Sequence, residues 1–118
     1  MKCASPALAF LLMTSISVPA TALTGTQLYK SCLTTTGSGA VMCTVYVRGF
    51  VDGFLMGKLV GQESPPLYCP PDAGVDAQQA RLIVRKFLSN HPEKLHEEAA
   101  FVTSEALMTA FPCSTKSK

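Results

Sequence analysis

The side chains best suited to chemistry lie close together in the last third of the chain, at His91, Glu93, His96, Glu97 and Glu98. The run from His96 begins like the zinc-protease motif H-E-x-x-H, but Ala100 stands where the second histidine is needed. His91 and His96 are not spaced to share one side of a helix as metal ligands. Acidic side chains are favourable near the N-terminus of a helix. The cluster is therefore better interpreted as the first turn of a helix, with His91 as its cap and Glu93 and Glu97 on its solvated face.

The rest of the sequence also lacks the patterns of an enzyme. No serine stands in a nucleophile motif, and Gly49, Gly53 and Gly57 do not lie between a strand and a helix, as a phosphate-binding loop requires. We therefore predict no catalytic residue, no metal site and no cofactor, and a protein that is not an enzyme.

Cysteines provide the clearest chemical signal. One of the five, Cys3, lies in an N-terminal leader-like segment, and the other four are Cys32, Cys43, Cys69 and Cys113. No C-x-x-C is present, and an even number of cysteines in a short exported chain indicates disulfides. Four cysteines allow three pairings, which sequence alone does not distinguish. We favour Cys32–Cys43 and Cys69–Cys113, because each would close one helical hairpin.

Residues 1–22 have the pattern of a signal peptide. Lys2 precedes an apolar run, and Ala20-Thr21-Ala22 is a small-x-small cleavage site. A membrane anchor is the alternative, but the apolar run is short for a bilayer. We expect export to the periplasm, with residues 23–118 left as one small domain and no membrane association after cleavage. The net charge of the full chain is only +2, which argues against a nucleic-acid partner.

The segment from Cys69 to Cys113 is predicted to be a helical hairpin. Asp76 is a helix N-cap, with Gln79 placed to bond back to it. A second helix should begin at Pro92 in its first turn and end before Pro112. The apolar positions of both helices follow the spacing of one buried stripe: Ala80, Ile83, Val84, Phe87 and Leu88 in the first, and Leu95, Ala99, Val102, Ala106, Leu107, Ala110 and Phe111 in the second.

Residues 40–60 are the most apolar part of the expected mature chain. Strand propensity and a transmembrane span are competing interpretations, but Arg48, Asp52 and Lys58 disfavour the span. Arg48 and Asp52 are also spaced to pair on a helix. We predict a buried central helix on which the glycines at 49, 53 and 57 form a smooth face for a closely packed second helix. With a short helix over residues 26–32 and an irregular segment over 62–74, the fold class is all-α: a small disulfide-stabilised bundle of about four helices.

The chain from residue 24 to 113 resembles the Rap–Tai family of bacterial immunity proteins. The resemblance rests on an ordered set of pieces: Leu28…Cys32, the segment from Cys43 to Gly53, Cys69-Pro70, Gly74-Val75 with Gln79, Phe87-Leu88, His91-Pro92-Glu93 with His96, and Ala106-Leu107…Ala110-Phe111-Pro112-Cys113. The stretch from Cys69 to Val75 is one residue longer than in the usual family pattern.

The resemblance implies a periplasmic immunity protein of a type VI secretion system. Such proteins bind a peptidoglycan amidase effector and occlude its active site, and they often form homodimers. A loop must then enter the cleft of the amidase. We expect it to be the 62–72 segment, with Glu63, Tyr68 and Asp72 as contacts, although this segment could also be a plain connector.

A small periplasmic stress chaperone is the alternative function. Such a protein would expose a broad apolar patch after dissociation or acidification. The side chains that could supply the patch are Phe50, Phe54, Phe87 and Phe101.

Overall fold

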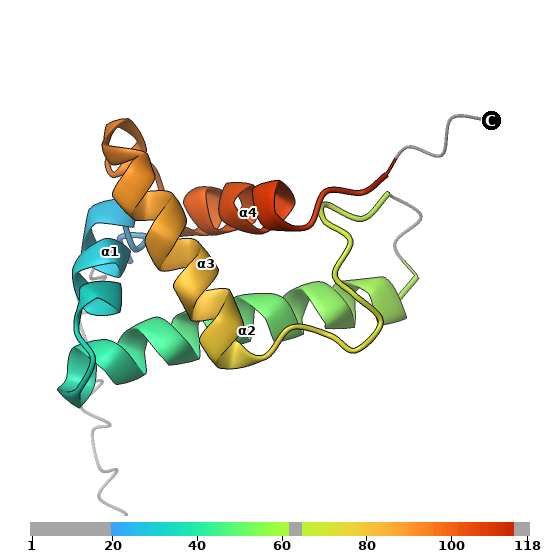
Figure 1. The fold of residues 1–118 in the computed structure, drawn as a ribbon, viewed down its shortest axis with the longest axis horizontal. Helices are drawn as coiled ribbons and strands as arrows, with labels where there is room; N and C mark the ends of the chain where they lie inside the picture. The colour runs from blue at the N-terminus through green and yellow to red at the C-terminus, as the bar shows by residue number, and fades with distance from the viewer. Residues whose placement is uncertain (1–19, 62–64, 115–118) are drawn as a thin grey trace, which may run out of the picture.

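The computed structural model describes residues 20–61 and 65–114. These residues form four α-helices: α1 (Gly25–Leu33), α2 (Gly37–Leu59), α3 (Ala77–Asn90) and α4 (Ala99–Ala110). A 3-10 turn, Pro92–Lys94, precedes α4. Helices α2 and α4 run along the long axis of the molecule, and α3 crosses obliquely in front of them (Figure 1). The predicted all-α bundle of four helices is confirmed. Of the predicted leader, residues 1–19 lie outside the described part of the chain.

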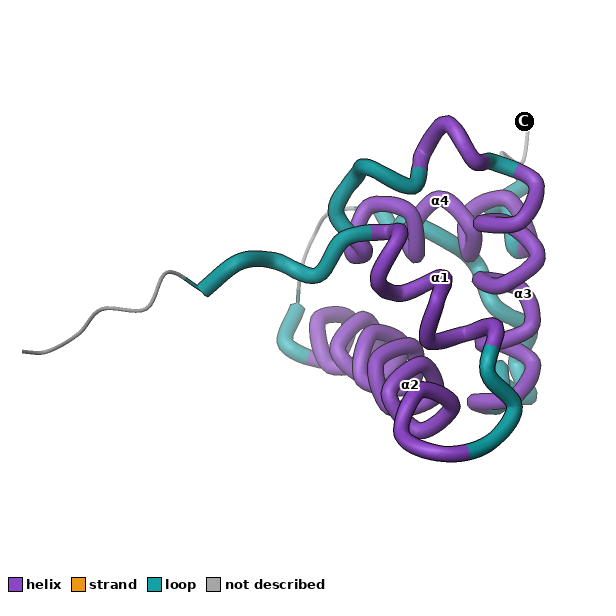
Figure 2. The backbone as a smooth tube through the Cα atoms, turned by 90° about the vertical axis from the view of Figure 1, so that its left-hand side faces the viewer, coloured by secondary structure: helices purple, strands orange, loops and turns teal. Residues whose placement is uncertain are grey.

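Helices α1 and α2 form the first hairpin. Cys32 near the end of α1 is bonded to Cys43 in α2, and Cys69 to Cys113, so the structure has the favoured pairing. A capping box that we had not predicted begins α1. The Gln27 N–H donates to the Thr24 hydroxyl (3.3 Å), and the Thr24 N–H donates to Gln27 Oε1 (2.9 Å). Seen from the side, α1 has α2 below it, α4 above it and α3 beside it (Figure 2).

Helix α3 forms as its sequence predicts. The Asp76 carboxylate accepts from the backbone N–H groups of Gln78 and Gln79, at 2.8 and 2.9 Å. The expected return bond from the Gln79 side chain is not formed within the described chain. Ala80, Val84 and Leu88 are fully buried, so the predicted apolar stripe does face the core.

The second helix of the hairpin differs from the prediction. It is not continuous from Pro92, because the chain makes a 3-10 turn there and begins α4 only at Ala99. Leu95 therefore lies before the helix, and Ala110 at its end is exposed. The rest of the predicted stripe holds, with its buried members being Ala99, Val102, Ala106 and Leu107.

Long-range backbone bonds explain this break. The first N–H groups of a helix have no partner within it. The N–H groups of Gly25 and Thr26 at the start of α1 donate to the carbonyls of Glu97 and Leu95, both at 2.7 Å. The Ala99 N–H in turn donates to the Leu23 carbonyl, also at 2.7 Å. The turn before α4 thus caps α1 instead of continuing the helix. A Cβ at Gly25 would lie 3.1 Å from the Leu95 carbonyl oxygen, so any other residue would have to push this backbone away by a few tenths of an ångström, and the approach favours glycine.

Helix α2 is a helix, as predicted, but it is not a buried one. Only Cys43, Val47 and Val51 are buried along it. Its opposite side carries exposed apolar residues at helical spacing around Gly49 and Gly53, and we call this side the outer face. Its apolar members are Val41, Met42, Val45, Met56, Leu59 and Val60.

Contrary to the prediction, no segment within residues 20–61 and 65–114 packs closely against the glycines of α2. A Cβ added at Gly49, Gly53 or Gly57 would meet nothing within 4 Å. The helix has the length and composition to cross a membrane, and with only 17% of its most apolar window buried it differs from the mostly buried core helix of a soluble protein. The disulfide to α1 and the ion pair between Arg48 and Asp52 favour a helix that is part of the bundle.

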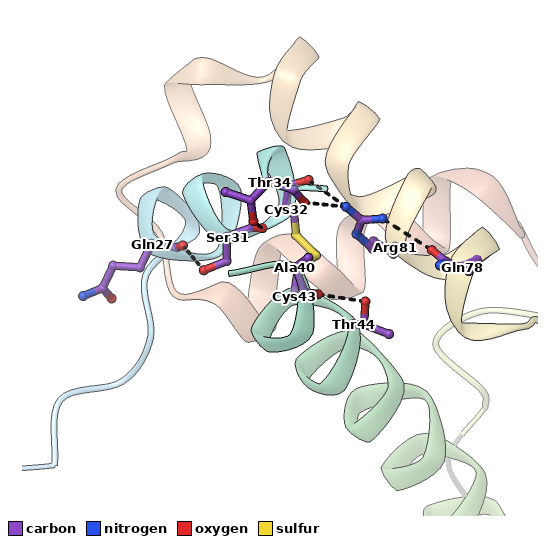
Figure 3. Close-up of a disulfide and its surroundings, with 9 residues drawn as sticks. All are labelled: Gln27, Ser31, Cys32, Thr34, Ala40, Cys43, Thr44, Gln78 and Arg81. Carbon is purple, nitrogen blue, oxygen red and sulfur yellow. Dashed lines mark hydrogen bonds between the residues drawn. A yellow bond between two sulfur atoms is a disulfide. The ribbon is translucent and has the colours of Figure 1, made fainter. Parts of the chain in front are cut away.

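Arg81 joins the C-terminal end of α1 to α3. Arg81 is only 8% exposed. Its guanidinium donates to the carbonyls of Thr34 (2.7 Å) and Cys32 (3.5 Å), beside the Cys32–Cys43 disulfide (Figure 3). The last carbonyls of a helix lack partners within it and form the negative end of its dipole. No carboxylate pairs with Arg81 in residues 20–61 and 65–114. The helix end therefore supplies the negative charge that this buried cation requires.

We predict that Arg81→Met lowers the free energy of unfolding by roughly 2–3 kcal/mol, because it leaves carbonyls of α1 without a charged donor. Lys86→Met on the exposed side of the same helix is the matched control and should change it by less than about 0.5 kcal/mol. Urea denaturation of the oxidised protein measures both values. Equal stability of the two variants would show that Arg81 does not hold α1 in place.

Candidate functional site

The loop from residue 65 to 76 connects α2 to α3 and is anchored to the bundle at several points. The Cys69–Cys113 disulfide ties it to the end of α4, and the Cys69 N–H donates to the Phe111 carbonyl at 2.9 Å. Gly74 has φ +79°, and its N–H donates to the Pro71 carbonyl at 2.8 Å, closing a turn. The loop lies at the end of the bundle between the last turns of α2 and α4 (Figure 1). It is therefore a fixed surface rather than a slack connector.

Tyr68 holds this loop against α2. Its side chain stacks on Phe54 with the ring centroids 4.1 Å apart, and the residue is only 1% exposed. Burial raises the pKa of its phenol above the ordinary value. The Tyr68 hydroxyl has no hydrogen-bond partner within the described residues. An unpartnered hydroxyl of this kind costs free energy unless a partner or ligand satisfies it.

A cavity of about 220 Å³ lies between α2 and the loop. Val51 and Leu55 line it from α2, and Tyr68 and Val75 line it from the loop. Its charged lining residues are Arg48, Asp52 and Asp76.

The predicted pair between Arg48 and Asp52 is present at this cavity. Arg48 Nε lies 2.9 and 2.8 Å from the two carboxylate oxygens of Asp52. Both side chains are about half exposed, so the pair contributes little to stability. The pair matters for the site because it places two charged side chains beside the 65–76 loop.

The three predicted effector contacts lie in different environments. Asp72 is exposed on the loop, whereas Tyr68 is buried and lines the cavity. Glu63 lies outside the described residues. Sequence reasoning missed Arg48, Asp52 and Asp76 as members of a site, since it treated α2 as buried and Asp76 only as a helix cap. The one available signal was the spacing of Arg48 and Asp52.

The histidine and glutamate cluster stabilises the turn before α4. His91 Nδ1 lies 3.0 Å from Glu93 Oε1, but the predicted cap by the His91 side chain is not formed. Lys94 donates to Glu105 of α4 at 2.8 Å and lies 3.8 Å from Glu97. No group of three His, Cys, Asp or Glu suited to a metal ion occurs among the described residues.

The pKa values of this turn follow from its hydrogen bonds. The pKa of Glu93 is lowered, first by the hydrogen bond from its own backbone N–H and then by the bond with His91. The pKa of Lys94 is raised, mainly by its hydrogen bond to Glu105. These shifts belong to surface pairs that fix the turn, and neither Glu93 nor Lys94 lines the cavity beside α2 or the hollow at the start of α3.

Comparison with known proteins places this arrangement in a family. No curated protein sequence matches the chain. The family model for Rap1a immunity proteins matches residues 24–113. That range begins at the N-cap of α1 and ends at the cysteine of the second disulfide, so it contains all four helices and both bonds. The chain belongs to the family of Rap1a immunity proteins.

Proposed function

We propose that the protein binds a type VI secretion peptidoglycan amidase in the periplasm and occludes its active site. The observation that carries this proposal is the family match over residues 24–113, because Rap1a membership implies immunity to a type VI effector. The choice of an amidase is supported by the motif resemblance, and occlusion by the anchored loop beside the cavity. The protein then acts by binding and has no chemistry of its own.

A periplasmic location is consistent with both disulfides, which persist in oxidising compartments. The signal peptide of residues 1–22 remains part of the proposal. Thr21 and Ala22 of the proposed cleavage site lie on exposed, non-helical chain.

We propose that the loop from residue 65 to 76 is the effector-binding surface. Asp72 is exposed there and can contact a partner directly. Tyr68 would act through the cavity that it lines, because its side chain is otherwise covered. Glu63 just before this loop completes the proposed contacts.

We also propose that two copies of the protein form a homodimer through the outer face of α2. Large exposed apolar patches on soluble proteins mark interaction sites, and Leu59 alone is 78% exposed. The glycines at 49 and 53 lie at the middle of the face, with bulky residues toward both ends. Two copies related by a two-fold axis could therefore cross closely at the glycines. None of the apolar residues of the outer face lines the cavity, so the two proposed surfaces use different residues of α2.

We expect the protein to inhibit wall digestion by the amidase of its own strain. Asp72→Ala, Glu63→Ala and Tyr68→Phe should each weaken the complex, and the triple variant by at least about tenfold, which is roughly 1.4 kcal/mol. Tyr68→Phe keeps the ring on Phe54 and removes only the hydroxyl. Glu93→Ala, on the turn before α4, is the control and should bind like the wild type. Calorimetric titration and a turbidity assay on cell walls measure these effects. Unchanged affinity in the triple variant would place the contact surface elsewhere.

The dimer can be tested with Gly53→Leu. A Cβ at this position would meet nothing within 4 Å in the described chain, and leucine suits a helix, so the monomer should remain folded. It would block the helix crossing and shift the population to monomer. Thr35→Leu, on an exposed loop, introduces the same side chain away from the face and should leave the dimer intact. Light scattering coupled to gel filtration gives the molar mass. A monomeric wild type, or a dimeric Gly53→Leu, would contradict the proposal.

A stress chaperone is the second candidate, and the exposed outer face of α2 is the observation in its favour. Of the four phenylalanines expected to form its apolar patch, only Phe101 is exposed, at 64%, and Phe50, Phe54 and Phe87 are half-buried. In this function the patch is exposed either by dissociation of a dimer or by opening of the fold in mild acid, and the second route can be tested directly.

We predict that the fold stays closed at pH 5. A carboxyl whose pKa is lowered by folding contributes stability above its ordinary pKa, and this contribution disappears only as the pH falls through the lower, folded value. Glu93 therefore remains ionised, because its pKa lies below the ordinary 4.5. Circular dichroism should be the same at pH 5 and pH 7, and client aggregation should be unaffected. Loss of the folded signal with suppressed aggregation at pH 5 would favour the chaperone.

A further inference from the structure

We propose that the cavity between α2 and the 65–76 loop binds one lysine or arginine side chain of the partner protein. This inference rests on the proposed function, because the partner protein is the effector. It adds the chemical class of the effector residue that enters the cavity.

The size and walls of the cavity suit a long side chain with an apolar stem. Its volume of about 220 Å³ is below the range of roughly 300–1,000 Å³ typical of small-molecule sites. Val51, Tyr68 and Val75 supply apolar surface. Lysine and arginine bury their methylene stems against such surface and keep their charged ends at a polar rim. A cavity of this form is better matched to one basic side chain than to a cofactor.

The charges at the rim select a cation. Two carboxylates, Asp52 and Asp76, line the cavity with a single guanidinium, that of Arg48. Arg48 is already paired through Nε with both oxygens of Asp52. Asp72, which is exposed, lies next to the lining residue Ala73 and adds a further negative charge. An incoming acidic group would therefore be repelled, and a cation would be attracted.

One acceptor at the cavity has capacity left for a donor. Both backbone N–H groups that cap α3 bind Asp76 Oδ1, which leaves Oδ2 without a bond in the described chain. Tyr68 also lines the cavity, but its hydroxyl is buried from solvent, so we do not count it as an acceptor for an incoming group. An ammonium group has three N–H donors and a guanidinium has five, so either has a donor for the free oxygen of Asp76. Donation to an ionised carboxylate is the stronger kind of hydrogen bond.

The first experiment uses small probes and the full oxidised protein, followed by backbone-amide NMR. The probes are the N-acetyl methylamides of lysine and arginine, with citrulline as the neutral match of arginine and glutamate as the anion. We expect saturable shifts with the two cations only, at the amides of residues 51, 55, 74 and 75, and dissociation constants on the order of millimolar. Equal shifts with citrulline, stronger shifts with glutamate, or none with any probe would overturn the proposal.

Two variants test whether the cavity contributes to binding of the effector. Ala73→Leu should fill the cavity from the exposed loop, and Asp52→Asn removes one rim charge. Both variants should weaken binding of the lysine and arginine probes severalfold. The variant that weakens probe binding more should also weaken effector binding more. Glu93→Gln removes a carboxylate away from the cavity and should change neither. Effector binding that is unchanged by Ala73→Leu would overturn the inference while leaving the immunity function intact. Probe binding that responds to both variants, in a protein that inhibits no amidase, would support the cavity and contradict the proposed function.

Discussion

The structure depends on how the two ends of α1 are held. A helix of nine residues is not stable alone in water, and its unpaired backbone groups need partners from elsewhere. The turn before α4 accepts the first N–H groups of α1, and Arg81 of α3 donates to its last carbonyls. The Cys32–Cys43 disulfide then attaches α2. Among the described helices, α1 is thus the one that links the other three through backbone groups or a covalent bond.

The position of α2 follows from this arrangement. Its buried residues, Cys43, Val47 and Val51, recur every four residues and form one narrow stripe against the core. The rest of the helix projects past α1, with Tyr68 and the loop packed on its second half. This leaves two surfaces of different character on the same helix: an apolar outer face with glycines at its middle, and a charged rim beside the loop. The proposed dimer and the proposed effector site use one each.

Local patterns predicted the elements better than their surroundings. The Asp76 cap and the apolar stripe were enough to identify α3, and the cysteines were enough to propose both hairpins. The break before α4 depends on hydrogen bonds to Gly25 and Thr26, about seventy residues away, which no local pattern contains. Glycine spacing in α2 correctly predicts a smooth face but cannot tell a partner within the chain from one outside it. The Arg48–Asp52 pair was predicted, but its place beside the 65–76 loop is a tertiary feature.

The two disulfides also differ in their access to solvent. Cys32 and Cys43 are completely buried, whereas Cys69 and Cys113 are both exposed. Thiol–disulfide exchange requires a thiolate to reach a sulfur atom, so reductants attack the exposed bond first. Opening it would release the 65–76 loop from α4 and leave the bond between α1 and α2 intact. The redox state of the compartment would thus control the shape of this loop before it affected the survival of the fold.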